Sequence, residues 1–295
     1  MTGDDWLFFT EITLAGLGSG ALLSLTAIAF VLIYKATRII NLAVSELLMM
    51  GSYFFLTLSA GWGLPTWIAI PGAVLGGAAI GWAIERGVIR RMLGESPISI
   101  FMVTVGLGSV LTGLVILIWG ADPRALPDFI GRSPVFLGEA YLNRKVLVAF
   151  IVSLVVIGVL LLLFRFWRGG VALRATATDQ AAAYSCGINV PGVFSLAWAV
   201  GCGLAAGAGI FLGAIGGLSP VMGAFGLSAL VVVIVGGLDS PFGALVAGLM
   251  VGVTEAWVGT YLGGEFKLAT TFLILIVMLM IRPYGLFGTR EIERL

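Results

Sequence analysis

The sequence has no histidine, only two cysteines and few charged residues. Without an imidazole, the chain cannot form a Ser-His triad, an HExxH metalloprotease site or any metal site that needs a histidine ligand. Cys186 and Cys202 lack the CxxC spacing of metal and redox sites, so we expect no metal and no disulfide. We interpret both as small core residues. These absences argue against an enzyme.

A phosphate-binding loop is missing too, because none of the three lysines follows a glycine, as the GxxxxGK[ST] pattern requires. Any ATP that serves this chain must therefore be hydrolysed by another chain, and we expect no cofactor here. The formal net charge of +1, without a basic stripe, argues against nucleic acid as a partner.

Apolar residues dominate the chain instead. They make up 60% of its 295 residues, only 11% are charged, and the mean hydropathy is +1.12. Soluble domains have about 25% charged residues. Spanning about 30 Å of hydrocarbon takes about 20 helical residues, and apolar runs of this kind recur from end to end. They fall at 12–34, 40–60, 64–84, 97–119, 145–164, 191–215, 225–237, 240–261 and 267–282.

We therefore predict an all-α fold, a polytopic helical bundle in the membrane, formed by residues 1–295 as a single transmembrane domain. It has eight or nine membrane segments. The count depends on "VVVIVGGLDSPFGAL", where a long apolar stretch is interrupted by a tight hairpin or by a broken, re-entrant helix. The interrupting residues are Gly236, Gly237, Asp239 and Pro241.

The basic residues predict the orientation. With the spans placed in order, 11 of the 16 Lys and Arg residues fall on one side, which the positive-inside rule assigns to the cytoplasm. The N-terminus is then outside and the C-terminus inside, which nine spans satisfy and eight satisfy only with a re-entrant segment. "MTGDDWLFF" lacks the cationic start of a cleavable signal, so we expect the first span to be retained. The 11 residues are Lys35, Arg38, Arg86, Arg90, Arg91, Arg165, Arg168, Arg174, Arg282, Arg290 and Arg294.

Glycine pairs predict how the helices pack. Small residues four apart form a groove on a helix, along which two backbones approach closely. Their number predicts a compact bundle with little room for a wide pore. The pairs are Gly16/Gly20, Gly72/Gly76, Gly77/Gly81, Gly203/Gly207, Gly209/Gly213 and Gly248/Gly252.

The stretch "ATRIINLAVSELLMMGSYFF" places polar side chains at the start of an apolar run. We interpret Asn41 as the N-cap of the following helix. Ser45 and Ser52 continue from it at helical spacing, whereas Glu46 lies about 140° around the helix. Asn41 and Glu46 are therefore expected to face different neighbours.

A carboxylate in hydrocarbon must be paired, protonated or turned toward water. Two interpretations remain open. In the first, the amide only caps the helix and Glu46 pairs with a basic residue such as Arg38 or Arg86. In the second, the helix begins inside the protein and its polar groups border a substrate path. The residues of this second interpretation are Asn41, Ser45, Glu46 and, in "VGVTEAWVG", Glu255.

The loop "RFWRGGVALRATATDQAAAYSCGINVPG" predicts a short helix from about 171 to 186. Gly187 suits a helix C-cap, and Pro191 suits the first turn of the next span. The helix is too polar to insert into lipid and too apolar to stand alone. An interfacial helix on the headgroups is one interpretation, but this helix has one basic residue where such helices have many. We favour docking to a protein partner through about residues 165–190.

"GLGSGALLSLTAIAFVLIYKATRIINLAVSELLMMGSYFF" resembles the amino-terminal region of the branched-chain amino acid ABC importer permeases, and of the related urea and short-chain amide permeases. The likeness continues in order through "SPISIFMVTVGLGSVLTGLV", "LRATATDQAAAYSCGINV" and "GLSALVVVIVGGLDSPFGALVAGLMVGVTEAW" to "MIRPYGLFG". It covers nearly the whole chain. Its most specific pieces are residues 38–41 with Glu46, the loop with Arg174 and Asp179, and Arg282 with Pro283.

The resemblance implies a permease embedded in the lipid of a bacterial inner membrane. Its implied partners are a second, homologous permease, two cytoplasmic ATPases that bind ATP and Mg²⁺, and a soluble binding protein that delivers substrate from outside. In such importers a cytoplasmic coupling helix of each permease sits in a cleft of an ATPase, and residues 171–189 match that stretch. The residues implied in the coupling are Arg174, Thr178, Asp179, Gly187 and Asn189.

The chain departs from the family at Val44 and Ser45, where many members have a His-Gly pair. The site is therefore expected to be less polar, and leucine and an apolar or aromatic acid are both open as substrates. We expect the membrane subunit of an ATP-driven importer for branched-chain or other hydrophobic amino acids. The alternative is a stand-alone secondary transporter with Glu46 or Glu255 as proton carrier, or a channel, for a small solute such as urea, an amide or an aromatic acid.

Overall fold

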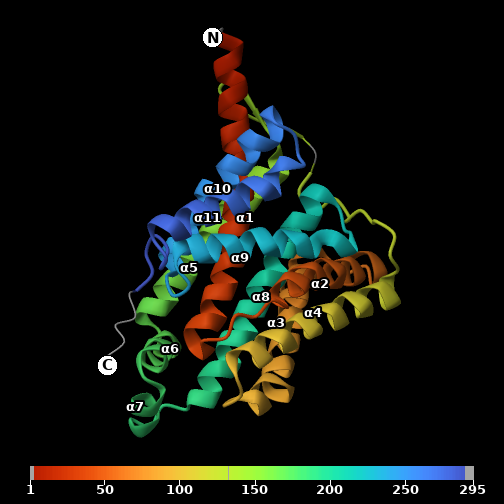
Figure 1. The fold of residues 1–295 in the computed structure, drawn as a ribbon. Coiled ribbons are helices and arrows are strands. Elements are labelled where there is room, and N and C mark those ends of the chain that lie inside the picture. The colour runs from red at the N-terminus through yellow and green to blue at the C-terminus, as the bar shows by residue number, and fades with distance from the viewer. Residues whose placement is uncertain (1–2, 132, 290–295) are drawn as a thin grey trace.

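The structure is a computed structural model that describes residues 3–131 and 133–289 (Figure 1). Arg132, Arg290 and Arg294, which enter the charge count above, lie outside the described residues. The elements are α1 (Gly3–Thr37), α2 (Val44–Leu56), η1 (Thr57–Gly61), α3 (Thr66–Gly87), η2 (Ile89–Met92), α4 (Pro97–Trp119), β1 (Val135–Leu137), β2 (Ala140–Leu142), α5 (Arg144–Phe166), α6 (Arg168–Thr178), α7 (Gln180–Ser185), α8 (Val190–Gly216), η3 (Pro220–Gly223), α9 (Ala224–Gly236), α10 (Pro241–Tyr261) and α11 (Phe266–Ile281).

Seven helices in the described part of the chain are long and apolar enough to cross a membrane, by length and composition. Two shorter apolar helices join them: Pro220–Gly236, which is η3 continued by α9, and Phe266–Ile281, which is α11. Together they match the apolar runs of the sequence in order. The predicted polytopic helical membrane bundle is therefore confirmed. The small antiparallel hairpin β1–β2 is an addition that the sequence did not predict.

The first helix, α1, is the central element of the bundle. It has 35 residues, which corresponds to a length of about 50 Å at 1.5 Å per residue. It packs against α5, α8, α9 and α10, and it runs through the middle of the fold (Figure 1). A helix that is apolar on all sides is one that its neighbours cover completely. This burial explains why α1 has no polar face along most of its length.

Glycine pairs make the close helix contacts that their spacing predicts. Gly16 and Gly20 of α1 face Gly252 and Gly248 of α10, so that a Cβ built on Gly252 would overlap the Cα of Gly20. The other four pairs also lie at helix contacts. Gly72/Gly76 face side chains of α2 and η1, Gly77/Gly81 face α8, Gly203/Gly207 face α3, and Gly209/Gly213 face α2.

The interruption between the apolar runs 225–237 and 240–261 is a tight hairpin of α9 and α10. A Cβ built on Gly236 would lie 2.5 Å from the carbonyl carbon of Gly243, so the two helices touch at their ends. Gly237 has a φ of 109°, which favours glycine, and Pro241 is the first residue of α10. The hairpin alternative is thus the one that forms.

The two ends of the bundle carry different elements. The N-terminus lies at one end, and α6 and α7 lie at the other (Figure 1). At the N-terminal end, Glu11 accepts a hydrogen bond from Tyr141 N of β2 at 2.6 Å. At the α6–α7 end, Lys35 Nζ donates to the backbone oxygen of Asp239 at 3.1 Å. The predicted docking loop therefore lies at the opposite end from the N-terminus.

Three local predictions are wrong. The helix expected over 171–186 is two helices, because Asp179 has extended backbone and caps the second of them. Asn41 is not the N-cap of α2, because α2 begins only at Val44, after a short irregular segment. Cys186 is exposed rather than a core residue, whereas Cys202 is buried as expected.

Candidate functional site

A cavity of about 690 Å³ lies between the first turn of α2, the middle of α4, and the start of η3 and α9. Its walls are mostly apolar, with hydroxyl groups and a single carboxylate from the described residues. We call this cavity the Glu46 groove. Its polar lining residues are Ser45, Glu46, Thr104, Ser109 and Thr112.

Glu46 enters the groove from the first turn of α2 and is half-buried. Glycines from two other elements leave room for its carboxylate. A Cβ built on Gly108 of α4 would lie 3.1 Å from Glu46 Oε2, and one on Gly223 of η3 would lie 3.0 Å from Oε1. Both distances are tighter than ordinary contacts, so a larger residue at either position would crowd the carboxylate.

Within residues 3–131 and 133–289, no ion pair to Glu46 is found. The guanidinium of Arg38 lies over the Tyr34 ring, 5.7 Å from its centroid, and that of Arg86 lies over the Trp82 ring at 5.3 Å. The pairing of Glu46 with Arg38 or Arg86, which the first interpretation requires, is therefore not formed. Instead, Glu46 faces a cavity, as the second interpretation requires.

The other polar residues of this stretch have different surroundings. Ser45 lines the groove and packs against Gly226 of α9, and Ser52 donates to the backbone oxygen of Gly209 on α8 at 2.5 Å. Asn41 lies outside the groove and is buried, with its Oδ1 accepting from Ala43 N at 3.1 Å and its Nδ2 without a partner among the described residues. Asn41 thus orders the chain before α2, while Ser45 and Glu46 face the groove.

The chain between α1 and α2 lines both this groove and a second cavity. We call residues 38–43 the entry segment. Leu42 lines the Glu46 groove, and its backbone N–H donates to Thr104 Oγ1 of α4 at 3.3 Å. Ile39 and Ile40 line a cavity of about 400 Å³, together with the start of α4. The entry segment therefore contributes to the walls of both cavities.

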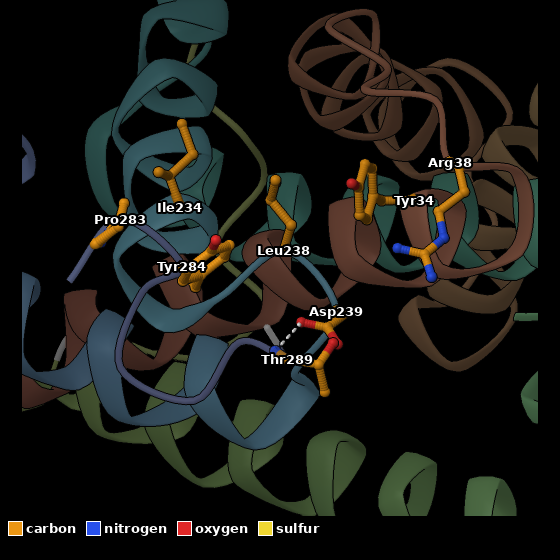
Figure 2. Close-up of a pocket in the computed structure, with 8 residues that line it drawn as sticks. All are labelled: Tyr34, Arg38, Ile234, Leu238, Asp239, Pro283, Tyr284 and Thr289. Atoms are coloured by element: carbon orange, nitrogen blue, oxygen red, sulfur yellow. Dashed lines mark hydrogen bonds between the residues drawn. The ribbon is translucent and has the colours of Figure 1, made fainter. Parts of the chain in front are cut away.

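Arg38, where the entry segment begins, contacts α6. Its backbone is left-handed, with a φ of 60°, a conformation that non-glycine residues rarely adopt. Its Nη2 donates to the backbone oxygen of Ala177 on α6 at 3.3 Å. Figure 2 shows Arg38 and Tyr34 on one side of a cavity of about 150 Å³, with Tyr284 and Pro283 on the other. The docking loop, the end of α1 and the C-terminal segment thus meet around Arg38.

Asp239 lies in the turn between α9 and α10 and lines the same cavity (Figure 2). Its carboxylate accepts from Thr289 N at 3.3 Å and from the Thr289 hydroxyl. The Asp239 side chain therefore attaches the C-terminal segment to the turn. This is a structural role that its position at the helix break did not reveal.

The predicted coupling residues contact other parts of their own loop. We call residues 168–189 the docking element. Arg174 Nη1 donates to the backbone oxygen of Phe164 at 2.8 Å and Nη2 to that of Arg165 at 3.3 Å, which fastens α6 to the end of α5. Thr178 Oγ1 donates to the backbone oxygen of Arg174 at 3.0 Å. The Arg174 side chain therefore holds α6 in place, whereas the Thr178 bond lies within α6.

Three further residues shape the rest of the docking element. Asp179 Oδ1 accepts from two backbone N–H groups at the start of α7, at 2.8 and 3.0 Å. Gly187 has a φ of 84°, which ends α7 as predicted. Asn189 caps α8, accepting from Gly192 N at 3.1 Å. All five predicted coupling residues are nevertheless exposed, so they remain on the surface of the docking element.

Glu255, the second predicted carboxylate, lies apart from the Glu46 groove. It is on α10 and accepts a hydrogen bond from Thr271 Oγ1 of α11. The groove is lined instead by residues of α2, α4, η3 and α9, with Leu42. The two candidate carboxylates therefore do not share a site.

A buried ion pair at the α6–α7 end was missed by the sequence analysis. Glu85 is 1% exposed and pairs with Arg90, with Nε to Oε1 at 3.0 Å and Nη2 to Oε2 at 2.9 Å. Ser195 of α8 donates to Glu85 Oε2 at 2.6 Å. The sequence contained one signal for this pair, an acid five positions before an arginine at the end of an apolar run. It contained no signal for Ser195, which lies 110 positions after Glu85.

Comparisons with known proteins agree with this architecture. A family model described as "Branched-chain amino acid transport system / permease component" matches residues 12–281. The chain is 31% identical over 307 residues to the high-affinity branched-chain amino acid transport system permease protein LivH of Salmonella typhimurium, covering 99% of each chain. It is 31% identical over 295 residues to the corresponding permease protein BraD of Pseudomonas aeruginosa, covering 95% of each.

One solved structure shows the same fold. PsaBC from Streptococcus pneumoniae in complex with Fab has a TM-score of 0.50 and 15% identity, over 93% of this chain and 92% of that chain. At this level of identity, the likeness concerns the arrangement of the helices alone.

Proposed function

Since this chain belongs to the family of permease components of branched-chain amino acid transport systems, we propose that it is a membrane subunit of an ATP-driven importer for branched-chain or other hydrophobic amino acids. A second, homologous permease, two cytoplasmic ATPases that bind ATP and Mg²⁺, and an external binding protein complete the importer. The chain itself performs no covalent chemistry.

The Glu46 groove is the observation that supports this proposal most directly. It combines a carboxylate, several hydroxyls and apolar walls in one open groove at the surface of the helical bundle. An amino acid with an apolar side chain needs both kinds of surface. The neighbouring face of α4 is uncovered, with Leu117 81% exposed and Ile118 60% exposed. This apolar face suits lipid or the second permease.

A continuous route leads from the docking element to the groove. Arg38 bonds to Ala177 of α6, and the entry segment that follows Arg38 leads to Leu42 and Glu46. In our proposal, the ATPases move the docking element, and the entry segment carries that movement to the groove. The α6–α7 end then faces the cytoplasm together with the C-terminus, and the N-terminus faces outward.

The proposal predicts that uptake depends on ATP and on partner chains. An affinity-tagged chain, purified with the chains that co-purify and reconstituted in proteoliposomes, is expected to accumulate L-leucine only with ATP on the cytoplasmic side and binding protein outside. Reconstituted alone, it is expected to be inert. Accumulation by the isolated chain under a pH gradient, without ATP, would instead support the secondary transporter, and simple equilibration would support the channel.

A second prediction concerns the surface of the docking element. Tyr184 of α7 is 71% exposed and is the largest exposed side chain of that helix. Tyr184→Asp is expected to lower the amount of co-purifying ATPase, and L-leucine uptake, by about tenfold, as for a central aromatic interface residue. Folding should be unaffected, because exposed substitutions change stability by about 0.5 kcal/mol or less.

The matched control is Phe136→Asp, which changes an aromatic residue that is 66% exposed in β1, at the opposite end of the bundle. That variant is expected to retain the ATPases. Equal ATPase recovery with Tyr184→Asp and with the unchanged chain would show that α7 is not the docking surface.

A further inference from the structure

The Glu46 groove contains an acidic side chain but, among the described residues, no basic side chain beside it. Its described lining contains one carboxylate and four hydroxyl side chains, and it contains no lysine or arginine. We propose that Glu46 binds the ammonium group of the transported solute, so that the groove accepts amino acids and amines and rejects organic acids that lack an ammonium group. The inference rests on the proposed function and names the chemistry of the same site.

Burial disfavours the charged form of Glu46, and the N-terminal end of α2 offsets part of that cost. Glu46 lies in the first turn of α2, where the helix dipole favours a negative charge. The carboxylate is half-buried, so water screens it less than at a free surface. A cation that reaches it gains a charge-assisted hydrogen bond, which is about twice as strong as a neutral one. The carboxylate of an organic acid would be repelled by an ionised Glu46.

The surroundings leave the carboxylate open to a ligand. Gly108 and Gly223 flank its two oxygens at distances where a larger residue would crowd the carboxylate. Since no protein cation bonds to Glu46 among the described residues, its charge remains to be matched by a ligand. The hydroxyls of Ser45 and Thr104 lie in the same lining and can accept further ammonium protons.

Apolar residues line the rest of the groove and suit a hydrocarbon side chain. They come from α4, η3, α9 and the entry segment, and include Leu42, Val105, Ile116, Val221 and Leu227. A solute with an ammonium group beside a branched hydrocarbon therefore satisfies both surfaces. An aromatic or aliphatic acid satisfies only the apolar one and places its carboxylate near Glu46.

The test measures protection of an engineered thiol in the groove. Ser109 is an exposed lining residue, so Ser109→Cys is introduced after Cys186→Ser and Cys202→Ala have removed the native thiols. Maleimide labelling is followed in membrane vesicles that contain the whole complex. Three probes share one hydrocarbon skeleton: L-leucine carries ammonium and carboxylate, isoamylamine only ammonium, and isocaproate only carboxylate.

L-leucine and isoamylamine are expected to slow labelling by about fivefold at concentrations several times their dissociation constants, whereas isocaproate should not slow it. Glu46→Gln should weaken both protecting probes by about tenfold, the usual effect of losing a hydrogen bond to a charged group. Glu46→Asp keeps the charge and should keep the discrimination. Glu265→Gln, which changes an exposed carboxylate at the start of α11, is the control and should change nothing.

Equal protection by isocaproate and isoamylamine, full protection in Glu46→Gln, or no protection by any probe would each overturn the inference. If Ser109→Cys does not reach the membrane, Thr112→Cys provides a second position in the same lining. Labelling needs no ATP. A failure of ATP-driven uptake therefore counts against the proposed function alone, and a failure of protection counts against the role of Glu46 alone.

Discussion

Replacing Gly209 by alanine is expected to destabilise the chain by about 3 kcal/mol, the upper part of the usual range for overpacking a core. Gly209 lies where α8 crosses α2, and a Cβ built there would overlap the carbonyl oxygen of Leu48 and lie 2.7 Å from its carbonyl carbon. The obstacle is helix backbone, which cannot rotate away. The same contact holds the hydrogen bond from Ser52 to the Gly209 oxygen, at 2.5 Å.

The expected change in stability for Gly209→Ala is opposite in sign to the usual effect of replacing glycine by alanine in a helix. In an exposed helix, Gly→Ala stabilises by about 1 kcal/mol, because alanine has the higher helix propensity. Gly158→Ala is therefore the matched control, since Gly158 lies in α5 and none of the residues that the structure describes comes within 4 Å of its built Cβ. Denaturant unfolding in detergent should show a loss for Gly209→Ala and no loss for Gly158→Ala. Equal denaturant midpoints for the two variants would mean that α2 and α8 can move apart to accommodate the added methyl group at residue 209.

The architecture could be predicted because it depends on local patterns. Each apolar run forms a helix, since a backbone in lipid must satisfy its own hydrogen bonds. Gly16 and Gly20 could be assigned to a helix contact because spacing alone places both on one face. Gly187 could be assigned to a helix end because its left-handed conformation suits glycine.

The wrong predictions concern segments in which a side-chain hydrogen bond or an unusual backbone conformation changes the structure that the local sequence pattern favours. An alanine-rich segment predicts one continuous helix, but Asp179 hydrogen-bonds the following backbone N–H groups and divides it. Asn41 likewise bonds the N–H of Ala43, and α2 begins only at Val44. Arg38 adopts a left-handed conformation that its residue type does not predict.

The candidate site could be predicted only in part, because it is built from distant segments. Glu46 and Ser45 could be recognised as unusual polar residues at the start of an apolar run. Their groove, however, needs Gly108 from α4 and Gly223 from η3, and no spacing rule connects those positions with Glu46. The separation of Glu255 from the groove likewise depends on how α10 packs against α11.

Replacing Arg90 by alanine is expected to destabilise the chain by about 3 kcal/mol, the lower end of the range for breaking a buried ion pair, because the Arg90 side chain is 31% exposed. The Glu85 carboxylate is 1% exposed, and Arg90 supplies two hydrogen bonds to it, at 2.9 and 3.0 Å. Arg90 Nη2 also donates to the backbone oxygen of Pro191 at 3.0 Å and to Ser195 Oγ at 2.6 Å. The pair thus joins the end of α3 to the start of α8, directly after the docking element.

The loss of stability in Arg90→Ala should come from the unpaired charge of Glu85 rather than from the lost packing contacts of Arg90. Arg90→Ala leaves Glu85 buried without its cation, whereas the double variant Glu85→Gln with Arg90→Met removes both charges and keeps similar volumes. The double variant is therefore expected to be milder, since replacing a buried pair by uncharged residues is often close to neutral. Arg91→Ala, at the exposed neighbouring arginine, should change stability by about 0.5 kcal/mol or less. Detergent unfolding of both variants tests this explanation. An equal loss of stability in Arg90→Ala and in the double variant would mean that Arg90 stabilises the chain through packing rather than by neutralising Glu85.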